Sequence, residues 1–467
     1  MNLSFHGAAR MVTGSKHLLR LPRGINLLLD CGMFQGNPRE ADQLNRHWGF
    51  EPKDISAVIL SHAHIDHCGL IPKLYADGFK GHVYCTPATY DLAEILLLDS
   101  AHIQQQDIRY HNKKRAARGE PPVHTLYNED DVRRALRHFR LVDYGETKKI
   151  NPQVSFFFTD AGHILGSASV HLTIQATDIT TQITYSGDVG RYGDELLRSP
   201  EKFPQPDYLI LESTYGDSLH EDTDTKLQKL LEAILHTCVE KKGKLIIPAF
   251  SVGRTQELIY ALNRLDTLKA LPDIDFYVDS PLSVEATEVM IKHQDELNDK
   301  FQRYLQRDRE PFRFRRLRYI TQIEESRMLN NHPGPCVIIS ASGMAESGRV
   351  KHHIKHAVSD ARNTILLVGY CEPNSLGGKL QRGYTEVTIF GEPFQVKAEV
   401  MKLASMSAHA DYDDLIHYLH HLQPDKVKQL FLVHGEYDVQ ANFRNKLALL
   451  GYRRIEIPSL HQEFALE

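Results

Sequence analysis

One short run of metal-binding side chains constrains this 467-residue chain more than any other feature of its sequence. The run, HAHIDH at residues 62–67, directly follows the apolar segment 57–60, which has the pattern of a buried strand. His62 and His64 are two residues apart, so an extended backbone would direct both side chains to one face. Imidazole nitrogens and carboxylates are ligands of zinc. A lone histidine would more often be an ordinary polar residue, but four donors in six residues predict a metal site.

Other apolar segments also end in residues that can bind metals or transfer protons. The segments 25–29, 154–158, 183–186, 208–211 and 430–433 are followed, in that order, by Asp30, His163, Asp188, Glu212 and His434. Polar side chains collected where strands end are typical of an enzyme built on a sheet. We therefore ask whether these strand ends converge.

Converging strand ends would supply the donors for two metal ions. The first set is His62, His64, His163 and Asp188, and the second is Asp66, His67, Asp188 and His434. Two zinc ions that share Asp188 could hold a hydroxide between them and stabilise both oxygens of a phosphoryl displacement. Spacing alone does not make Asp30 a ligand, and a carboxylate there suits a role in orienting a ligand histidine.

The composition is that of a globular protein with 42% hydrophobic and 25% charged residues. The net charge of −5 provides no global basic field, so a nucleic-acid partner would need a local basic patch. No cysteine pair has the spacing of a disulfide framework or a zinc ribbon. The sequence has no signal-peptide pattern and no apolar run of membrane-spanning length. We expect a cytoplasmic protein without a membrane segment.

The central part of the chain alternates between helical and strand patterns, which predicts a parallel sheet. We expect the domains to be residues 1–214, an inserted domain at 215–381, and a return to the first domain at 382–467. Two basic segments remain open to two interpretations. Residues 107–118 read as a solvated helix face in preference to a phosphate-contacting element. Residues 313–319 fit RNA-backbone contact with base stacking and an exposed strand equally well.

Taken together, these motifs resemble the metallo-β-lactamase superfamily and, within it, the β-CASP nucleases. The resemblance rests on the 62–67 run, on EST at 212–214, on PAFSVGRTQE at 248–257, on SASGM at 340–344, on SAHAD at 407–411 and on HGE at 434–436. The SAHAD run is similar to that of the endonuclease subunit of the pre-mRNA cleavage and polyadenylation factor and its prokaryotic relatives. The resemblance implies an α/β fold: an αββα metallo-β-lactamase sandwich with an inserted β-CASP domain built on a largely parallel sheet.

The resemblance also assigns roles outside the metal donors. His409 would be the general acid at the leaving oxygen, held by Glu212, and imidazole titrates in a suitable range. The alternative for His409 is a polar residue at a helix start, beside the candidate cap Asp411. The run around Gly253 is typical of a strand-to-helix turn that can bind an anion. There we take Ser251, Arg254 and Ser342 as candidate phosphate contacts.

The resulting expectation is a zinc-dependent ribonuclease with two Zn²⁺ ions. It would hydrolyse RNA phosphodiester bonds through a metal-bridging hydroxide and leave 5′-phosphate and 3′-hydroxyl ends. We expect endonuclease action, with 5′-to-3′ exonuclease action left open. RNA would be the partner, and a homodimer is a candidate oligomeric state. The alternatives are a small-molecule metallo-hydrolase of the same superfamily and a catalytically inactive RNA-binding scaffold.

Overall fold

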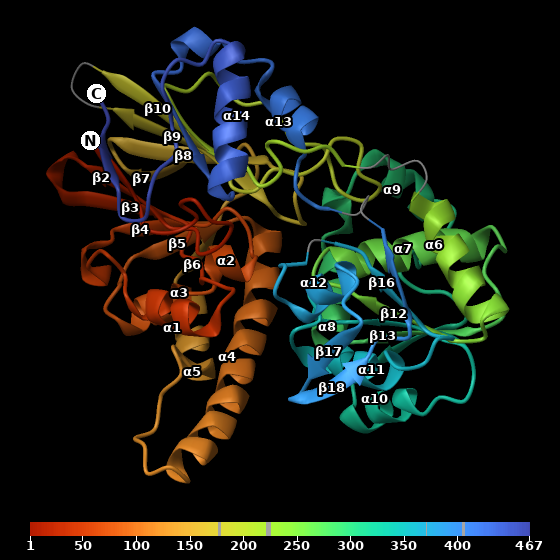
Figure 1. Cartoon of the computed structure of the whole chain (residues 1–467). Helices are drawn as coiled ribbons and strands as arrows, with labels where there is room; N and C mark the ends of the chain where they lie inside the picture. Colours follow the sequence, from red (N-terminus) through yellow and green to blue (C-terminus); the bar gives the residue numbers. More distant parts are fainter. Residues whose placement is uncertain (176–178, 221–225, 370, 404–406) are drawn as a thin grey trace. The chain divides into compact units, whose positions relative to one another are not determined.

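The computed structural model describes residues 1–175, 179–220, 226–369, 371–403 and 407–467. The chain forms two compact units (Figure 1). The first unit combines Met1–Leu219 with His409–Glu467, and the second is His220–Ala408. Among the described residues, no helix has both the length and the apolar character needed to cross a membrane.

The first unit contains two seven-stranded sheets. One sheet has the order β22 (Glu463–Ala465), β1 (Asn2–Phe5), β2 (His17–Leu21), β3 (Ile25–Leu29), β4 (Ala57–Ile59), β5 (His82–Cys85) and β6 (Phe139–Leu141). The other has the order β21 (Ile455–Glu456), β20 (Gln429–Val433), β11 (Tyr208–Glu212), β10 (Thr180–Tyr185), β9 (Ala168–Gln175), β8 (Val154–Asp160) and β7 (Lys148–Asn151). Strands β3 to β6 run parallel to one another, as do β10, β11, β20 and β21.

The two sheets pack face to face, and helices cover their outer faces. One buried apolar cluster joins residues of both sheets, such as Leu27 and Leu29 with Phe156 and Phe158. A second cluster joins the other face of β11 and β20 to α13 (Tyr412–Leu419) and α14 (Tyr437–Leu449). The remaining helices of this unit are α1 (Pro38–Arg46), α2 (Ile65–Cys68), α3 (Ile71–Ala76), α4 (Pro87–Ala116) and α5 (Glu129–Leu136). This arrangement is the expected αββα sandwich.

The second unit is built on a six-stranded sheet in which every pairing is parallel. Its order is β14 (Leu317–Ile320), β13 (Asp275–Asp279), β15 (Cys336–Ser340), β12 (Lys244–Pro248), β16 (Thr364–Leu367) and β19 (Glu399–Lys402). A hairpin is formed by β17 (Glu386–Ile389) and β18 (Glu392–Gln395). The helices are α6 (Lys226–Ile234), which continues as a π-helical turn at Leu235–Glu240, α7 (Arg254–Thr267), α8 (Pro281–Lys292), α9 (Asp299–Leu305), α10 (Ile323–Asn330), α11 (Gly348–Ala357) and α12 (Leu376–Gln381). The chain thus has the α/β fold class expected, with a parallel sheet in the inserted part.

Two features of the structure differ from the sequence-based expectation. Strand β19 pairs with β16, so the sheet of the second unit extends beyond residue 381, where we expected the chain to return to the first domain. The helix face expected at 107–118 is not a separate element but continues the helix that begins at Pro87, and no residue of α4 after Ala101 is buried. A strand pattern does not show which sheet the strand joins, and a solvated helix carries no strong apolar signal.

Candidate metal centre

The loops that follow the strands of the first unit bring the predicted donors together. Strand β4 ends at Ile59, and the chain then passes through His62 to His64, the residue that precedes α2. Helix α2 carries Asp66 and His67 in its single turn. The other donors follow β8, β10 and β20, which belong to the facing sheet. The centre is therefore assembled at one end of the sandwich by both sheets.

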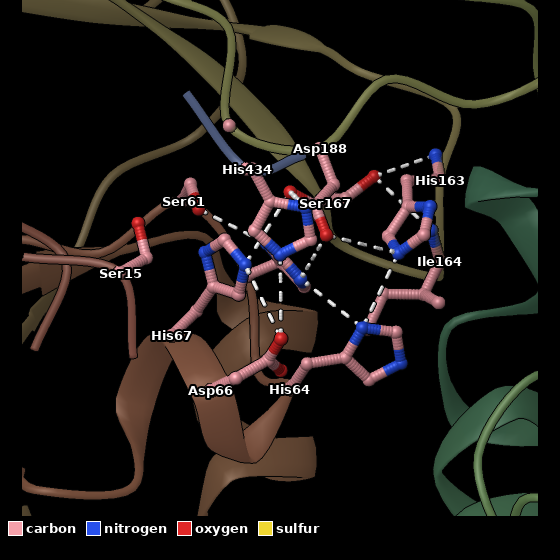
Figure 2. A network of polar contacts seen from close by, with 12 residues as sticks. Ser15, Ser61, His64, Asp66, His67, His163, Ile164, Ser167, Asp188 and His434 are labelled. Atoms are coloured by element: carbon pink, nitrogen blue, oxygen red, sulfur yellow. Dashed lines mark hydrogen bonds and ion pairs between the residues drawn. The ribbon is translucent and has the colours of Figure 1, made fainter. Parts of the chain in front are cut away.

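The first donor set consists of three imidazoles and one carboxylate oxygen. His64 Nδ1 lies 3.1 Å from His62 Nε2 and 3.2 Å from His163 Nε2. Asp188 Oδ2 lies 3.5 Å from His62 Nε2 and 3.6 Å from His163 Nε2. Figure 2 shows the side chains of His64, His163 and Asp188 turned toward one another.

These separations fit a tetrahedral metal ion. Ligand atoms that lie 2.0–2.1 Å from a tetrahedral zinc are about 3.3 Å apart, close to the four distances measured here. Burial is the main cause that lowers the pKa of His64 to about 4 and the pKa of His62 and His163 well below 6.5. Three neutral imidazoles whose nitrogens converge on one point are suited to binding a cation.

The second donor set lies on the other side of Asp188. Asp188 Oδ1 is 3.3 Å from His67 Nε2 and 3.7 Å from His434 Nδ1. His434 Nε2 is 3.3 Å from Asp66 Oδ2. His67 Nε2 and Asp188 Oδ1 are both buried, and neither makes a hydrogen bond within the described part of the chain. Two unsatisfied buried polar atoms that face each other are costly unless a further group occupies the site.

Asp30 holds one of these donors from behind. Its Oδ2 lies 2.7 Å from His67 Nδ1 and accepts hydrogen bonds from Ser61 Oγ at 2.7 Å and Tyr185 Oη at 2.6 Å. With Nδ1–H donated to Asp30, the ring of His67 presents Nε2 to the centre. This contact is the kind of carboxylate–histidine pair that orients metal ligands.

His409 and Glu212 form a pair beside the donors. His409 Nδ1 lies 3.2 Å from Glu212 Oε1 and 3.9 Å from Asp188 Oδ2. The carboxylate of Glu212 is fully buried and is fixed by the backbone N–H groups of Val189 and Thr214. The side chain of His409 remains 22% exposed, so it can meet a bound molecule.

The charges around His409 favour its protonated form. Burial acts to lower the pKa of its imidazole, but the negative charge and hydrogen bond of Glu212, together with Asp188, raise it to about 9. Asp411, the candidate cap predicted from the sequence, does cap α13 by accepting a hydrogen bond from Asp414 N. His409 therefore lies before the cap of α13 and is coupled to Glu212.

Sequence reasoning missed two residues of the centre. Thr214 Oγ1 donates to Glu212 Oε2 at 2.7 Å and lies 3.0 Å from His434 Nδ1, so it links the acid–base pair to the donors. Its place in the EST run at 212–214 was the available signal. Tyr185, which donates to Asp30, gave no signal because a tyrosine in a strand is usually part of the core.

The three candidate phosphate contacts lie in the second unit. Arg254 is 7% exposed and its guanidinium contacts Glu257, which also binds Lys226. Ser251 Oγ lies 3.4 Å from Ser280 Oγ, and Ser342 Oγ lies 3.4 Å from the carbonyl oxygen of Ser347. The contacts of Arg254 favour a role in fixing the start of α7.

In the basic run 313–319, arginine side chains are exposed and aromatic side chains are buried. Phe312 and Phe314 are buried, and Arg313, Arg315 and Arg318 are exposed. Arg315 and Arg316 pair with Asp273, and Arg316 also pairs with Asp275. Of the two interpretations left open, the structure therefore matches the solvated strand, whose charge is largely neutralised.

Comparison with known proteins gives three consecutive family matches. Residues 17–248 match the metallo-beta-lactamase superfamily, residues 255–380 match the Beta-Casp domain, and residues 394–458 match the Zn-dependent metallo-hydrolase RNA specificity domain. The order of the matches agrees with an inserted domain followed by a return to the sandwich.

Relatives match over nearly the whole chain. The chain is 36% identical over 445 residues to Ribonuclease TTHA0252 of Thermus thermophilus, covering 95% of each chain. It is 31% identical to the RNase J-like protein of Methanocaldococcus jannaschii, covering 98% of this chain and 97% of that one. It is 32% identical to Transcription termination factor FttA of Methanosarcina mazei, covering 92% of this chain and 66% of that factor. The chain is thus a metal-dependent hydrolase of the β-CASP ribonuclease family within the metallo-β-lactamase superfamily.

Proposed function

We propose that this chain is a zinc-dependent ribonuclease that hydrolyses RNA phosphodiester bonds and leaves 5′-phosphate and 3′-hydroxyl ends. We propose endonuclease action, with 5′-to-3′ exonuclease action as an additional mode. The observation that carries the proposal is the position of Asp188, whose two carboxylate oxygens face different groups of imidazoles. The coupled pair of His409 and Glu212 lies beside it.

The proposed ligands of one ion are His62, His64, His163 and Asp188, and those of the other are Asp66, His67, Asp188 and His434. Zinc bound there would supply a hydroxide nucleophile at neutral pH and stabilise charge on the phosphoryl oxygens. Asp30 keeps the Nε2 lone pair of His67 directed at the centre through its contact with Nδ1. The carboxylate of Asp188 belongs to both donor groups, so two ions bound there would lie close to each other.

His409 would protonate the departing 3′ oxygen. Its Nδ1–H is directed at Glu212, so Nε2–H is the proton available to a substrate. The raised pKa of the imidazole keeps that proton in place at neutral pH. When the bond between phosphorus and the 3′ oxygen breaks, transfer of this proton yields the 3′-hydroxyl end, and the phosphate remains on the 5′ side of the other product.

The choice of RNA is supported by the match of residues 394–458 to an RNA specificity domain and by the relatives whose names describe ribonucleases. Ser251 and Ser342 are proposed as phosphate contacts in the β-CASP domain, and Arg254 as a residue that supports them. We also infer a cytoplasmic location, since all six cysteines are free and buried as in a reducing compartment. A homodimer stays a prediction, which sedimentation of the purified chain would test.

End-labelled RNA tests the proposal directly. The zinc-loaded protein is incubated with an RNA labelled at its 5′ end or its 3′ end, with and without a 5′-phosphate. Internal fragments that carry 5′-phosphates and 3′-hydroxyls are expected, and mononucleotides released from the 5′ end would reveal the exonuclease mode. Intact RNA at saturating zinc, or products with cyclic phosphates, would overturn the proposal.

A further inference from the structure

The distal half of α4 forms a projection that the metal centre does not use. All the buried residues of α4 lie in its first half: Ala88, Thr89, Leu92, Ala93, Leu97 and Ala101. Figure 1 shows the far end of α4 and the segment that returns from it, in orange, extending away from the sheets of this unit. We call residues 103–126 the arm.

The arm is held by polar contacts instead of a core. Asn112 makes two reciprocal hydrogen bonds of 2.9 Å with the backbone of Val123. Arg115 donates to the carbonyl oxygen of Pro121 at 2.8 Å and pairs with Glu120 at 3.0 Å. Ordering each residue costs roughly 1–2 kcal/mol of backbone entropy, and little apolar burial offsets this cost here. A segment kept ordered in this way is suited to presenting its surface to a partner.

That surface is basic, and apart from the pair of Arg115 with Glu120 its positive charges are not paired in the described part of the chain. Residues 107–120 contain five Lys or Arg residues and two acidic residues, whereas the whole chain has a net charge of −5. Arg109, Lys113, Lys114 and Arg118 are exposed, and none of them forms an ion pair in the part of the chain that the structure describes. Tyr110 is 60% exposed and carries Lys114 Nζ 4.3 Å above its ring. The neutralised basic run at 313–319 provides no comparable surface.

The start of the same helix is attached to the metal centre. Thr86 Oγ1 and Thr89 Oγ1 donate to the carbonyl oxygen of Gly166 at 2.7 and 2.8 Å. Gly166 belongs to the loop that carries His163. At 1.5 Å per residue, α4 places Lys113 about 36 Å along the helix from Thr89. The arm thus holds its charges at a fixed and large distance from the catalytic end.

We infer that the arm binds the phosphate backbone of RNA at a point remote from the bond that is cleaved. Four cations beside an exposed aromatic ring are suited to backbone charge and to stacking of a base. Only an RNA long enough to cover this distance can contact the arm and the catalytic end at the same time. The arm therefore strengthens binding at the catalytic end for a long RNA, whereas a short RNA bound at the catalytic end does not reach the arm. The inference rests on the proposed action on RNA.

The test compares two triple variants that change the net charge equally. The arm variant is Lys113→Glu, Lys114→Glu and Arg118→Glu. The control is Arg39→Glu, Lys80→Glu and Lys149→Glu, three exposed residues of the same unit that lie outside the segment matched to the RNA specificity domain. All six positions are outside the metal centre, and equal thermal midpoints would show that both variants fold. A milder variant, Lys113→Gln with Lys114→Gln, should give an intermediate effect.

Two readouts are needed, on RNAs of about six and about forty nucleotides. In the arm variant we expect KM and Kd for the long RNA to rise about 10-fold at low salt, and the slope of log Kd against log salt to fall by about 2. The KM for the short RNA and kcat should stay unchanged, as should all values for the control. Unchanged long-RNA binding in the arm variant, or equal weakening in the control or on the short RNA, would overturn the inference. Arm-dependent binding without cleavage by the wild type would overturn only the proposed ribonuclease activity.

Discussion

Two buried aspartates, one in each unit, lie among histidines and support opposite conclusions. Asp279, at the end of β13, is fully buried. Its Oδ1 accepts from Arg349 Nη1 at 2.6 Å, and its Oδ2 lies 2.5 Å from Ser326 Oγ and 2.6 Å from His353 Nε2. Both oxygens are satisfied and a guanidinium supplies the opposite charge. Asp279 therefore needs no further ligand.

Asp188 is just as buried, at 2% exposure, but its surroundings are incomplete. Its Oδ1 makes no hydrogen bond, and within the described ranges no lysine or arginine forms an ion pair with it. Burial acts to lower the pKa of neighbouring His67, yet the charges of Asp188 and Asp30 raise it well above its usual value. The cluster attracts positive charge that its own residues do not fully provide. Satisfied partners thus indicate a structural carboxylate, and unsatisfied atoms indicate a cation site.

The strongest test of this contrast replaces one carboxylate oxygen in each cluster. Asp188→Asn should remove the charge shared by both donor groups, lower the zinc content below two ions per chain, and reduce kcat roughly a thousandfold or more, since metal ions contribute several kcal/mol to such reactions. Asp279→Asn should retain both ions. Zinc is measured by elemental analysis of the dialysed protein, beside turnover of a labelled RNA. Equal zinc content in Asp188→Asn and the wild type would refute the shared ligand.

A smaller effect is expected at His409, which lies beside the proposed metal ligands but is not one of them. His409→Ala should lower kcat about 100-fold through loss of the general acid while the zinc content remains that of the wild type. Glu212→Gln should have a weaker effect in the same direction, because the pKa of His409 would fall with the loss of the negative charge.

His417→Ala is the matched control, because this exposed histidine of α13 stacks on His420, and among the described residues no hydrogen bond or ion pair joins its side chain to the donors. Its kcat should equal that of the wild type. Loss of zinc in His409→Ala would show instead that His409 is a ligand, as its distance of 3.9 Å from Asp188 allows.

The sequence predicted the αββα sandwich, the inserted parallel sheet and the set of residues that gather at the centre. It could do so because each donor follows an apolar strand, and the ends of parallel strands meet at one edge of a sheet. His62 and Asp188 are 126 positions apart, yet a strand precedes each of them, and their side chains lie 3.5 Å apart. The roles of these residues as ligands remain a proposal.

Contacts made by packing could not be predicted in the same way. The hydroxyl of Tyr185 reaches Asp30 only because two sheets face each other, and no local pattern encodes that distance. The basic residues at 313–319 are neutralised by Asp273 and Asp275, about 40 positions earlier in the chain. The continuity of α4 was not predicted, because its distal half buries nothing and so lacks the periodic apolar pattern of a packed helix.

The smallest effect on catalysis is expected from Asp279→Asn, because both carboxylate oxygens of Asp279 already have hydrogen-bond partners within the second unit. Burial acts to raise the pKa of Asp279, but hydrogen bonds from His353, Ser326 and Arg349 outweigh it and lower that pKa. The ion pair should thus stabilise the second unit fully above the unfolded-state pKa of about 3.9. This stabilisation is lost as the pH falls through the lower pKa of the folded state. At neutral pH the substitution should cost about 3 kcal/mol, since it breaks a buried charge pair.

The measurement is urea unfolding of the second unit, followed by hydrogen exchange of the amides in β13 and β15, at several pH values. The difference between Asp279→Asn and the wild type should be constant at neutral pH and should narrow below pH 3.9 or so, where both proteins lack the charge. Asp360→Asn is the matched control. Its exposed partner Arg362 lies 2.7 Å away, and such a pair contributes at most about 1 kcal/mol. If both variants lost a similar, small part of the free energy of unfolding, the buried contacts of Asp279 would not stabilise the unit. Hydrogen-bonded oxygens would then no longer distinguish Asp279 as structural from Asp188 as a metal ligand.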